Sequence, residues 1–387
     1  MNGRRAGAAG AVLGLLLGVG LGCGRPRPAE LRIGYLPPLT GELAVIGTSH
    51  LEGAELAVAR VNAAGGITVG GRRHRVVLVS EDTGNDPEEA LRLAQRMINQ
   101  LGIAVLVAPM SSETAVPVAA QAERARMPTI VAGASHPEVT AGKRFVFRTT
   151  FTDHDQGRAM ARFAVEDLGA RRAAVLYDAA TVYSHDLAEI FARALAEAGG
   201  EVVATASYAG SAAGVDADYR PELRALAEHD PEVLFLPNYP LAVSRQVLQA
   251  REVGLDAVFL GSDSWSDKMA ADAPELQGAY FTRHWHPGVD IPESRAFVEE
   301  FRRELGHPPL TSAALSYEAL NLLFTVLDGL ESLDGERIRQ ALAEVDDYRG
   351  VTGRLSFRDG GDSRKDVVIL KIEDGRRRFH KLFPPER

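Results

Sequence analysis

Residues 105–137 read VLVAPMSSETAVPVAAQAERARMPTIVAGASHP, and this stretch decides the fold. Two short apolar runs of β type each end in a polar loop, and an alanine-rich helical pattern lies between them. This order predicts a strand, a helix and a second strand that lies parallel to the first. In an open parallel sheet, the carboxyl ends of such strands point into the ligand crevice. We therefore expect a binding site at the two polar loops.

The polar loops carry residues that suit an anionic ligand. Ser111, Ser112 and Thr114 stand where the helix is expected to begin, and residues 133–136 follow the second strand. Free N–H groups at a helix N-terminus attract an anion, and serine hydroxyls both donate and accept hydrogen bonds. A carboxylate would suit this place. Taken from this stretch alone, the alternative is that Ser112 or Thr114 caps the helix and that Ser135 shapes a turn.

The composition is that of a soluble globular protein with room for two domains. The chain has 387 residues, of which 45% are hydrophobic and 25% charged, and it contains no low-complexity tract. Its formal net charge of −9 argues against a broad attraction to nucleic acid or anionic lipid. We therefore expect no nucleic-acid partner.

The sequence offers no catalytic or metal-binding motif. It contains no GxxxxGK[ST] loop, no GxSxG elbow, no HExxH and no CxxC pattern. His284 and His286 form a close pair without a nearby cysteine, whereas catalytic zinc usually takes three protein ligands. We therefore predict no catalytic residues, no metal and no cofactor, so that the protein is not an enzyme.

The N-terminus carries the pattern of an export signal. Arg4 and Arg5 form a positive n-region, and residues 11–22 form an apolar run too short to span a bilayer. The only cysteine, Cys23, follows this run in a setting that resembles the lipobox of bacterial lipoproteins, although Gly20 stands where leucine is usual. We predict a signal peptide over residues 1–22, a lipidated Cys23 that anchors the protein to a membrane, and a tether over residues 23–30. The alternative for Cys23 is a buried thiol or an unrelated cysteine.

Strand and helix patterns alternate along the rest of the chain. The alternation begins with a strand at residues 31–36, pauses near residues 148–152, and then begins again as a second unit of similar size. It ends in a hairpin-like pair of strands at residues 367–372 and 378–382. This pattern predicts an α/β fold with parallel sheets that helices cover on both faces.

Short motifs in a specific order give the chain a family likeness. Each motif alone is weak, but their order and spacing together are specific. They are Ile33-Gly34-Tyr35, residues 38–41 (PLTG), residues 61–67 (VNAAGGI), Glu81-Asp82, Asp86-Pro87, Ser111-Ser112, Phe147-Arg148-Thr149, Tyr177-Asp178, residues 249–255 (QAREVGL) and Val351-Thr352-Gly353. With them the sequence resembles the branched-chain-amino-acid type of periplasmic solute-binding proteins, also called type I periplasmic binding proteins.

The resemblance implies two Rossmann-like lobes joined by three crossovers, with the ligand held between the lobes. It assigns residues 31–150 and 286–351 to lobe 1, residues 151–285 and 352–387 to lobe 2, and the crossovers to residues 148–153, 281–285 and 350–353. Such receptors close like a hinge. The ligand shifts the population to the closed form because it touches both lobes only there.

The resemblance also implies a set of contacts for an amino acid. Ser112 and Ser135 in lobe 1 match the residues that hold the α-carboxylate, and the carbonyl of Gly133 matches a contact to the ammonium. In lobe 2, Tyr183 matches a ligand-binding tyrosine, and Asp263 matches the acid that pairs with the ammonium. A buried carboxylate needs a cationic partner, so this combination is chemically coherent. The alternative for Asp263 is a helix cap.

Several residues around the same site depart from the family's usual pattern. Ile46 stands where an aromatic residue often precedes a glycine, and Glu113, His136 and Trp265 are polar or bulky where small residues are common. Glu113 and Trp265 are weaker ligand-contact candidates, with Tyr239 as a second aromatic one. Alternatively, the polar and bulky groups face solvent or pack on a lobe surface. If they line the pocket, the ligand need not be leucine, isoleucine or valine, and polar or aromatic amino acids and small amides stay open as alternatives.

The function implied by the resemblance is that of the extracytoplasmic substrate-binding protein of an ABC importer. Such a protein would capture an amino acid or a related small zwitterion by lobe closure. Its partners would be a permease with its ATPase subunits and a membrane that holds the lipid anchor, and the protein itself would be an exported monomer. The alternatives are a ligand-sensing receptor component for signalling, or a binder of an amide, urea or an aromatic acid.

Overall fold

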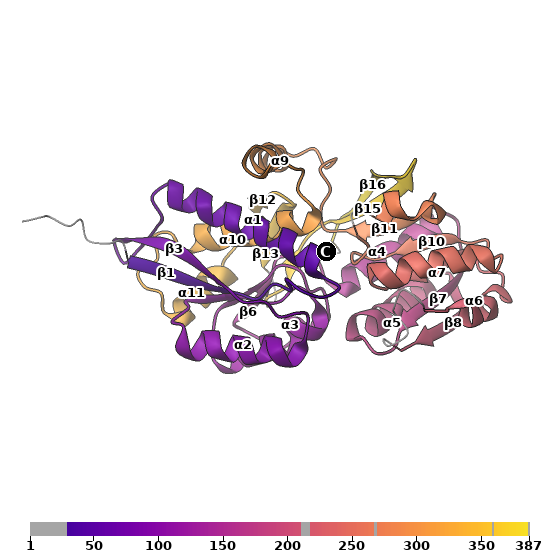
Figure 1. The fold of residues 1–387 in the computed structure, drawn as a ribbon, viewed down its shortest axis with the longest axis horizontal. Helices are drawn as coiled ribbons and strands as arrows, with labels where there is room; N and C mark the ends of the chain where they lie inside the picture. The colour runs from indigo at the N-terminus through magenta and orange to yellow at the C-terminus, as the bar shows by residue number, and fades with distance from the viewer. Residues whose placement is uncertain (1–28, 210–216, 267–268, 358–359, 386–387) are drawn as a thin grey trace, which may run out of the picture.

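The structure is a computed structural model that describes residues 29–209, 217–266, 269–357 and 360–385. The predicted signal peptide, Cys23 and the tether up to residue 28 lie outside the described residues. Within the described residues, the chain forms two α/β lobes that lie side by side, each built on its own sheet (Figure 1). None of the helices in this part of the chain has the length and apolar character needed to cross a membrane.

Lobe 1 is built on a sheet that has six strands in the described residues, in the order β2-β3-β1-β4-β5-β6. All neighbouring pairs are parallel except β2 and β3. The strands are β1 (Ala29–Tyr35), β2 (Ile67–Val69), β3 (Arg72–Ser80), β4 (Val105–Val107), β5 (Thr129–Val131) and β6 (Val146–Arg148). The helices are α1 (Ala44–Ala63), α2 (Pro87–Gln100), α3 (Ser112–Arg124), α9 (Pro292–Leu305), α10 (Thr311–Leu327) and α11 (Gly335–Ala343), with a 3₁₀ turn η1 (Pro137–Val139).

Lobe 2 is built on a sheet that has seven strands in the described residues, in the order β16-β15-β11-β10-β9-β7-β8. Its strands are β7 (Arg172–Asp178), β8 (Glu201–Tyr208), β9 (Val233–Leu236), β10 (Val258–Gly261), β11 (Tyr280–Arg283), β15 (Val367–Glu373) and β16 (Arg376–Phe383). Its helices are α4 (Asp153–Glu166), α5 (Val182–Glu197), α6 (Arg220–Ala227), α7 (Pro240–Glu252) and α8 (Met269–Asp272), with a 3₁₀ turn η3 (Pro274–Leu276). The predicted C-terminal hairpin, β15 with β16, is confirmed.

The central strands are short apolar runs because both faces of each sheet are covered. In β4, Val105 and Val107 belong to the core that includes α1 and α10, whereas Leu106 belongs to the core that includes α2 and α3. In β9, Leu234 and Phe235 likewise face opposite cores. A strand buried on both sides needs apolar side chains on both, as the sequence pattern predicted. The strand ends are then the places where polar residues meet a ligand.

In the part of the chain that the structure describes, three connections join the lobes, and one of them differs from the prediction. The chain crosses between β6 and α4 and between β11 and α9, close to the predicted places. The third crossover was predicted at residues 350–353, but β12 (Tyr348–Gly350), β13 (Gly353–Phe357) and β14 (Ser363–Arg364) form a small sheet first. Leu355 and Phe357 lie in the core of lobe 1, where Phe357 packs edge-on against Phe147. The predicted boundary at residue 351/352 is therefore wrong, and the chain enters lobe 2 between β14 and β15.

Candidate ligand-binding site

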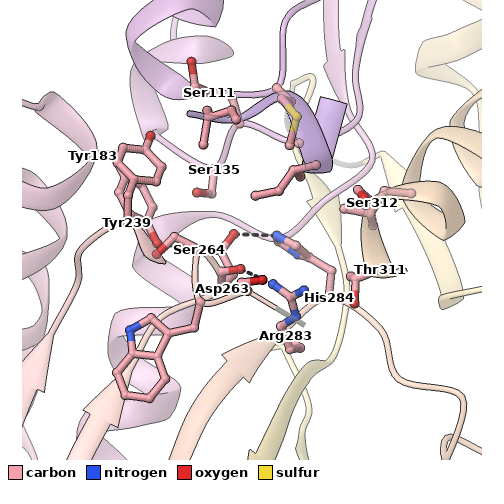
Figure 2. Close-up of a pocket in the computed structure, with 18 of the residues that line it drawn as sticks. Ser111, Ser135, Tyr183, Tyr239, Asp263, Ser264, Arg283, His284, Thr311 and Ser312 are labelled. Carbon is pink, nitrogen blue, oxygen red and sulfur yellow. Dashed lines mark hydrogen bonds and ion pairs between the residues drawn. The ribbon is translucent and has the colours of Figure 1, made fainter. Parts of the chain in front are cut away.

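A cavity lies between the two lobes, beside the carboxyl ends of β4, β5 and β10 (Figure 2). Its volume, counted as space for the centres of water-sized molecules, is about 100 Å³. A cavity that fits one water leaves almost no free space for the centre of that water, so this cavity has room for several water-sized groups. This is the size of a small organic molecule. Both lobes line the cavity, so a molecule held there contacts both of them.

Two serines at the ends of neighbouring strands form the polar wall of lobe 1. Ser112 begins α3 and Ser135 follows β5, and each is 2% exposed and borders the cavity. The cap position of α3 is Ser111, which makes no cap hydrogen bond because its hydroxyl bonds to Asn85 and Thr114 instead. Ser112 is therefore not a helix cap. The start of α3 keeps the positive potential that attracts an anion.

Gly133 allows the two loops of this wall to approach each other. A Cβ atom at this position would lie 2.9 Å from Cα of Met110, closer than packed atoms allow, so only glycine fits. The approach brings Ser112 and Ser135 to the same side of the cavity, as Figure 2 shows for the loop of Ser111 and for Ser135. Packing alone thus requires the glycine, and the predicted contact of its carbonyl with the ligand stays a prediction.

Apolar side chains complete the wall on the side of lobe 1. Leu43 and Ile46 stand at the start of α1, and Leu310 and Leu315 belong to the first turns of α10. Ile46, which departs from the family pattern, therefore lines the cavity. Burying an apolar group against these side chains contributes about 25 cal/mol per Å² of apolar surface removed from water.

Asp263 is the acid at the centre of the wall formed by lobe 2. Its carboxylate accepts hydrogen bonds from Tyr183 at 2.6 Å, from Gln156 at 2.8 Å and from His284 at 2.7 Å. Figure 2 shows His284 beside Asp263 in the cavity wall. Burial opposes ionisation of Asp263, but hydrogen bonds from His284, Tyr183 and Gln156 outweigh it and hold the pKa below its usual value. The carboxylate is therefore an anion at neutral pH. Because its oxygens bond to these three side chains, Asp263 does not act as a helix cap.

A second carboxyl group, Asp153, lies close to Asp263. Burial and the negative charge of Asp263 raise the pKa of Asp153 to about 7, although hydrogen bonds from Ser135 and Gln156 act in the opposite direction. The amide nitrogen of Gln156 bridges the two acids, 2.7 Å from Asp153 Oδ1 and 2.8 Å from Asp263 Oδ1. At neutral pH, Asp153 is therefore partly protonated and adds less than a full charge to the site.

Two of the weaker candidates pair with each other across the cleft. The carboxylate of Glu113, in the first turn of α3, accepts a hydrogen bond at 2.9 Å from the hydroxyl of Tyr239, which precedes α7. His136 makes a similar link, with Nε2 2.7 Å from a carboxylate oxygen of Asp186 in α5. Each pair joins lobe 1 to lobe 2. The side chains of Glu113 and His136 therefore contact the opposite lobe, and Tyr239 borders the cavity beside Tyr183.

Trp265 belongs to the core of lobe 2. Its side chain is fully buried, its indole N–H donates to the carbonyl oxygen of Leu236 at 3.0 Å, and its ring stacks on Phe281. It also borders the cavity. The structure favours the alternative that this bulky residue packs within its lobe.

Several residues of the cavity wall escaped sequence reasoning. Arg283, the last residue of β11, and His284, the first after it, both border the cavity, and Arg283 donates to the backbone carbonyl oxygen of Asp263. Gln156 lies in α4, and nothing in its sequence position indicates that it reaches Asp263. His284 drew attention only as a neighbour of His286 in a test for zinc. Among the described residues, no group of three or more histidine, cysteine, aspartate or glutamate side chains is placed to hold a metal ion.

Comparison with known proteins agrees with this geometry. Residues 30–376 match the family model described as periplasmic binding protein. An amino acid binding protein of Pseudomonas aeruginosa is 27% identical over 376 residues, which cover 96% of this chain and 97% of that protein. The crystal structure of the leucine binding protein LivK of Thermotoga maritima superposes with a TM-score of 0.83 at 28% identity, over 92% of this chain and 99% of that one.

A solute-binding protein of an ABC transporter from R. palustris, solved in complex with benzoate, also shares the fold. Its TM-score is 0.80 at 21% identity, over 92% of this chain and 97% of that one. At this identity the similarity shows the fold alone.

Two α/β lobes that close on a small cavity, with polar groups on both lobes, define a two-lobed solute-binding protein. The match over residues 30–376 makes the assignment specific: the chain belongs to the periplasmic binding protein family, as a type I member of the branched-chain amino acid type. It is a substrate-binding protein of the kind that serves ABC transporters. The predicted fold class and family are confirmed.

Proposed function

We propose that this substrate-binding protein captures an α-amino acid or a related small zwitterion between its lobes. The observation that carries the proposal is the placement of unlike polar groups on opposite walls of one cavity. Lobe 1 offers Ser112, Ser135 and the uncapped start of α3 to a carboxylate, and lobe 2 offers the carboxylate of Asp263 to an ammonium. A zwitterion satisfies both walls at once. It therefore stabilises the closed arrangement over the open one.

The apolar wall supports an apolar side chain on the ligand. Leu43, Ile46, Leu310 and Leu315 border the cavity on the side of lobe 1. The names of two relatives point the same way, since one is an amino acid binding protein and the other binds leucine, isoleucine, valine, threonine and alanine. An aromatic acid is the competing ligand for the same wall, and the experiment below distinguishes it from an amino acid.

The proposal includes a place in the cell and a set of partners. The export pattern of residues 1–22 and the position of Cys23 support a receptor outside the cytoplasm, anchored by a lipid on Cys23. There the closed, ligand-bound protein would deliver its ligand as a monomer to a permease powered by separate ATPase subunits. The protein itself binds the ligand and catalyses no reaction. Its ligand contacts include Tyr183, Gly133 and Asp263.

Melting of the purified protein with a panel of ligands tests the proposal. The panel holds the twenty amino acids together with urea, simple amides and benzoate, each at millimolar concentration. A ligand at 100 times its Kd stabilises the native state by about 2.7 kcal/mol, which raises the melting temperature by several degrees. We expect one or more amino acids with apolar side chains to do so. A shift with benzoate or urea and with no amino acid would refute the zwitterion as ligand.

Asp263→Asn is the matched variant for this panel. It keeps the size of the side chain and removes the charge that would pair with the ammonium. We expect a much greater loss of binding for amino acids than for ligands without an ammonium. An equal loss for both classes would remove Asp263 from the proposed role.

A further inference from the structure

His284 is the first residue after β11, at the point where the chain leaves lobe 2. Its side chain is 4% exposed and borders the cavity, and Phe151 covers the ring, with the two ring centroids 3.7 Å apart. The Nε2 atom lies 2.7 Å from Asp263 Oδ2. The Nδ1 atom is buried and has no hydrogen-bond partner among the described residues. Buried polar atoms are rarely left in that state, so this atom calls for a partner.

The charge of the imidazole decides what Nδ1 offers to a partner. Burial lowers the pKa of His284 below its usual value, although the hydrogen bond and the charge of Asp263 act in the opposite direction. The ring is therefore neutral at pH 7 and carries one proton. That proton lies on Nε2, because Nε2 faces the ionised carboxylate of Asp263. Nδ1 is then a hydrogen-bond acceptor, on a ring that lines the cavity beside Asp263.

We propose that Nδ1 of His284 contacts the ligand and accepts a hydrogen bond from the primary ammonium of a bound amino acid. The inference rests on the proposed amino-acid function and adds to it a residue that determines specificity. A primary ammonium has three N–H donors, enough for Asp263, His284 and a backbone carbonyl of lobe 1. A hydroxy acid offers one donor at the same place, and a simple carboxylic acid offers none. Neither analogue supplies the donors that the ammonium brings to Asp263 and His284, so each gains less on binding than the amino acid does.

A purely structural role for His284 would have a different requirement. If the imidazole only orients Asp263, the N–H donor at the ε position is what counts. If it contacts the ligand, the acceptor at the δ position is what counts. His284→Gln carries its amide at the ε position and can still donate to Asp263, but it lacks the δ acceptor. His284→Asn carries its amide oxygen at the δ position and lacks the ε donor.

The experiment compares an amino acid with its desamino analogue. The probes are L-leucine and 4-methylpentanoate, or the corresponding pair for the amino acid with the largest melting shift in the panel. Calorimetric titration at pH 7.5 gives the Kd of both probes for the wild type and both variants. We expect His284→Gln to raise the Kd of the amino acid by roughly tenfold to a hundredfold and to leave the Kd of the analogue unchanged. We expect His284→Asn to keep the preference for the amino acid.

The outcomes separate this inference from the function on which it rests. An equal change for both probes with His284→Gln, or no change for either, overturns the contact through Nδ1 while the amino-acid function stands. Loss of the preference with His284→Asn overturns it as well, so one folded variant is enough for a decision. The melting temperature of each variant without ligand shows whether it is folded. A wild type that binds no amino acid refutes the function itself, and the inference with it.

Discussion

Removing the hydroxyl of Tyr239 is expected to weaken the binding of every ligand by about the same factor. This hydroxyl donates to Glu113 at 2.9 Å and so links α7 of lobe 2 to α3 of lobe 1. The link exists only while the lobes are closed, because the two residues belong to different lobes. In an open form, water takes its place on both groups. Tyr239→Phe therefore destabilises the closed form and leaves the open form unaffected.

The size of the effect follows from the chemistry of the pair. A hydrogen bond to a charged group contributes about 1.5–3 kcal/mol, and this pair is only partly buried, so we take the lower end of that range. A loss of about 1.5 kcal/mol lowers the ratio of closed to open protein by roughly tenfold. Where the empty protein is mostly open, the apparent Kd rises by that whole factor, and where it is mostly closed the rise is smaller.

Calorimetry on Tyr239→Phe, Glu113→Gln and the double variant measures the pair directly. Two ligands with different polar ends are titrated, and small-angle scattering of the empty proteins reports the opening of the lobes. Glu113→Gln also removes a negative charge near the anion site, but the double-mutant cycle cancels that contribution. Tyr280→Phe, which makes the same change at a tyrosine packed against Phe163 in lobe 2, is the control. Additive losses from the two substitutions would show that no such pair forms, and a loss confined to one ligand would restore Tyr239 as a direct ligand contact.

Three further expectations concern the anion site and two buried charges. Ser112→Ala is expected to raise the Kd of ligands that carry a carboxylate by roughly tenfold, as measured by calorimetry, without lowering the melting temperature of the empty protein. Lys365→Met leaves the carboxylate of Glu318, whose side chain is 1% exposed, without its cation. We therefore expect the free energy of unfolding, measured in urea, to fall by about 3–5 kcal/mol, and we expect the double variant with Glu318→Leu to regain most of that loss. Folding raises the pKa of Asp153 from 3.8 to about 7, so the native state holds this proton more tightly than the unfolded state. The free energy of unfolding of the wild type, relative to that of Asp153→Asn, is therefore expected to fall as the pH rises from about 4 to 7 and then to level off. Urea unfolding at several pH values measures this difference, and a difference that does not change with pH would contradict the raised pKa of Asp153.

The fold was predictable because burial acts on each strand locally. A strand such as Val105–Val107, covered on both faces, must be apolar throughout, so it stands out from the amphipathic helices beside it. The position of the third crossover was predicted wrongly for the opposite reason. Val351-Thr352-Gly353 carries the turn pattern expected of a crossover, and nothing local shows that Leu355 and Phe357 bury themselves in the core of lobe 1. That fact depends on Phe147, which is far away in the sequence.

The site divides in the same way between what is local and what is not. Ser112 and Ser135 were predictable as cavity residues because each stands directly at a strand end, where the topology of a parallel sheet determines the direction of the loop. The partners of Glu113 and His136 were not, because each bond joins two lobes whose distance depends on closure. A polar residue beside a predicted site thus has two possible partners, the ligand or the facing lobe.

Chemistry distinguishes these two partners even where sequence position does not. Glu113 next to an anion site would repel a ligand carboxylate, so a hydroxyl donor from the facing lobe is the better partner, and Tyr239 supplies it. His284 presents the opposite case, since its ε nitrogen is already occupied by Asp263 while its δ nitrogen has no partner among the described residues. The first pair stabilises closure whatever the ligand is, whereas the second leaves an acceptor that only a ligand donor satisfies. Affinity for all ligands and preference among them are therefore carried by different residues of the same cleft, and substitutions at Tyr239 and His284 separate the two.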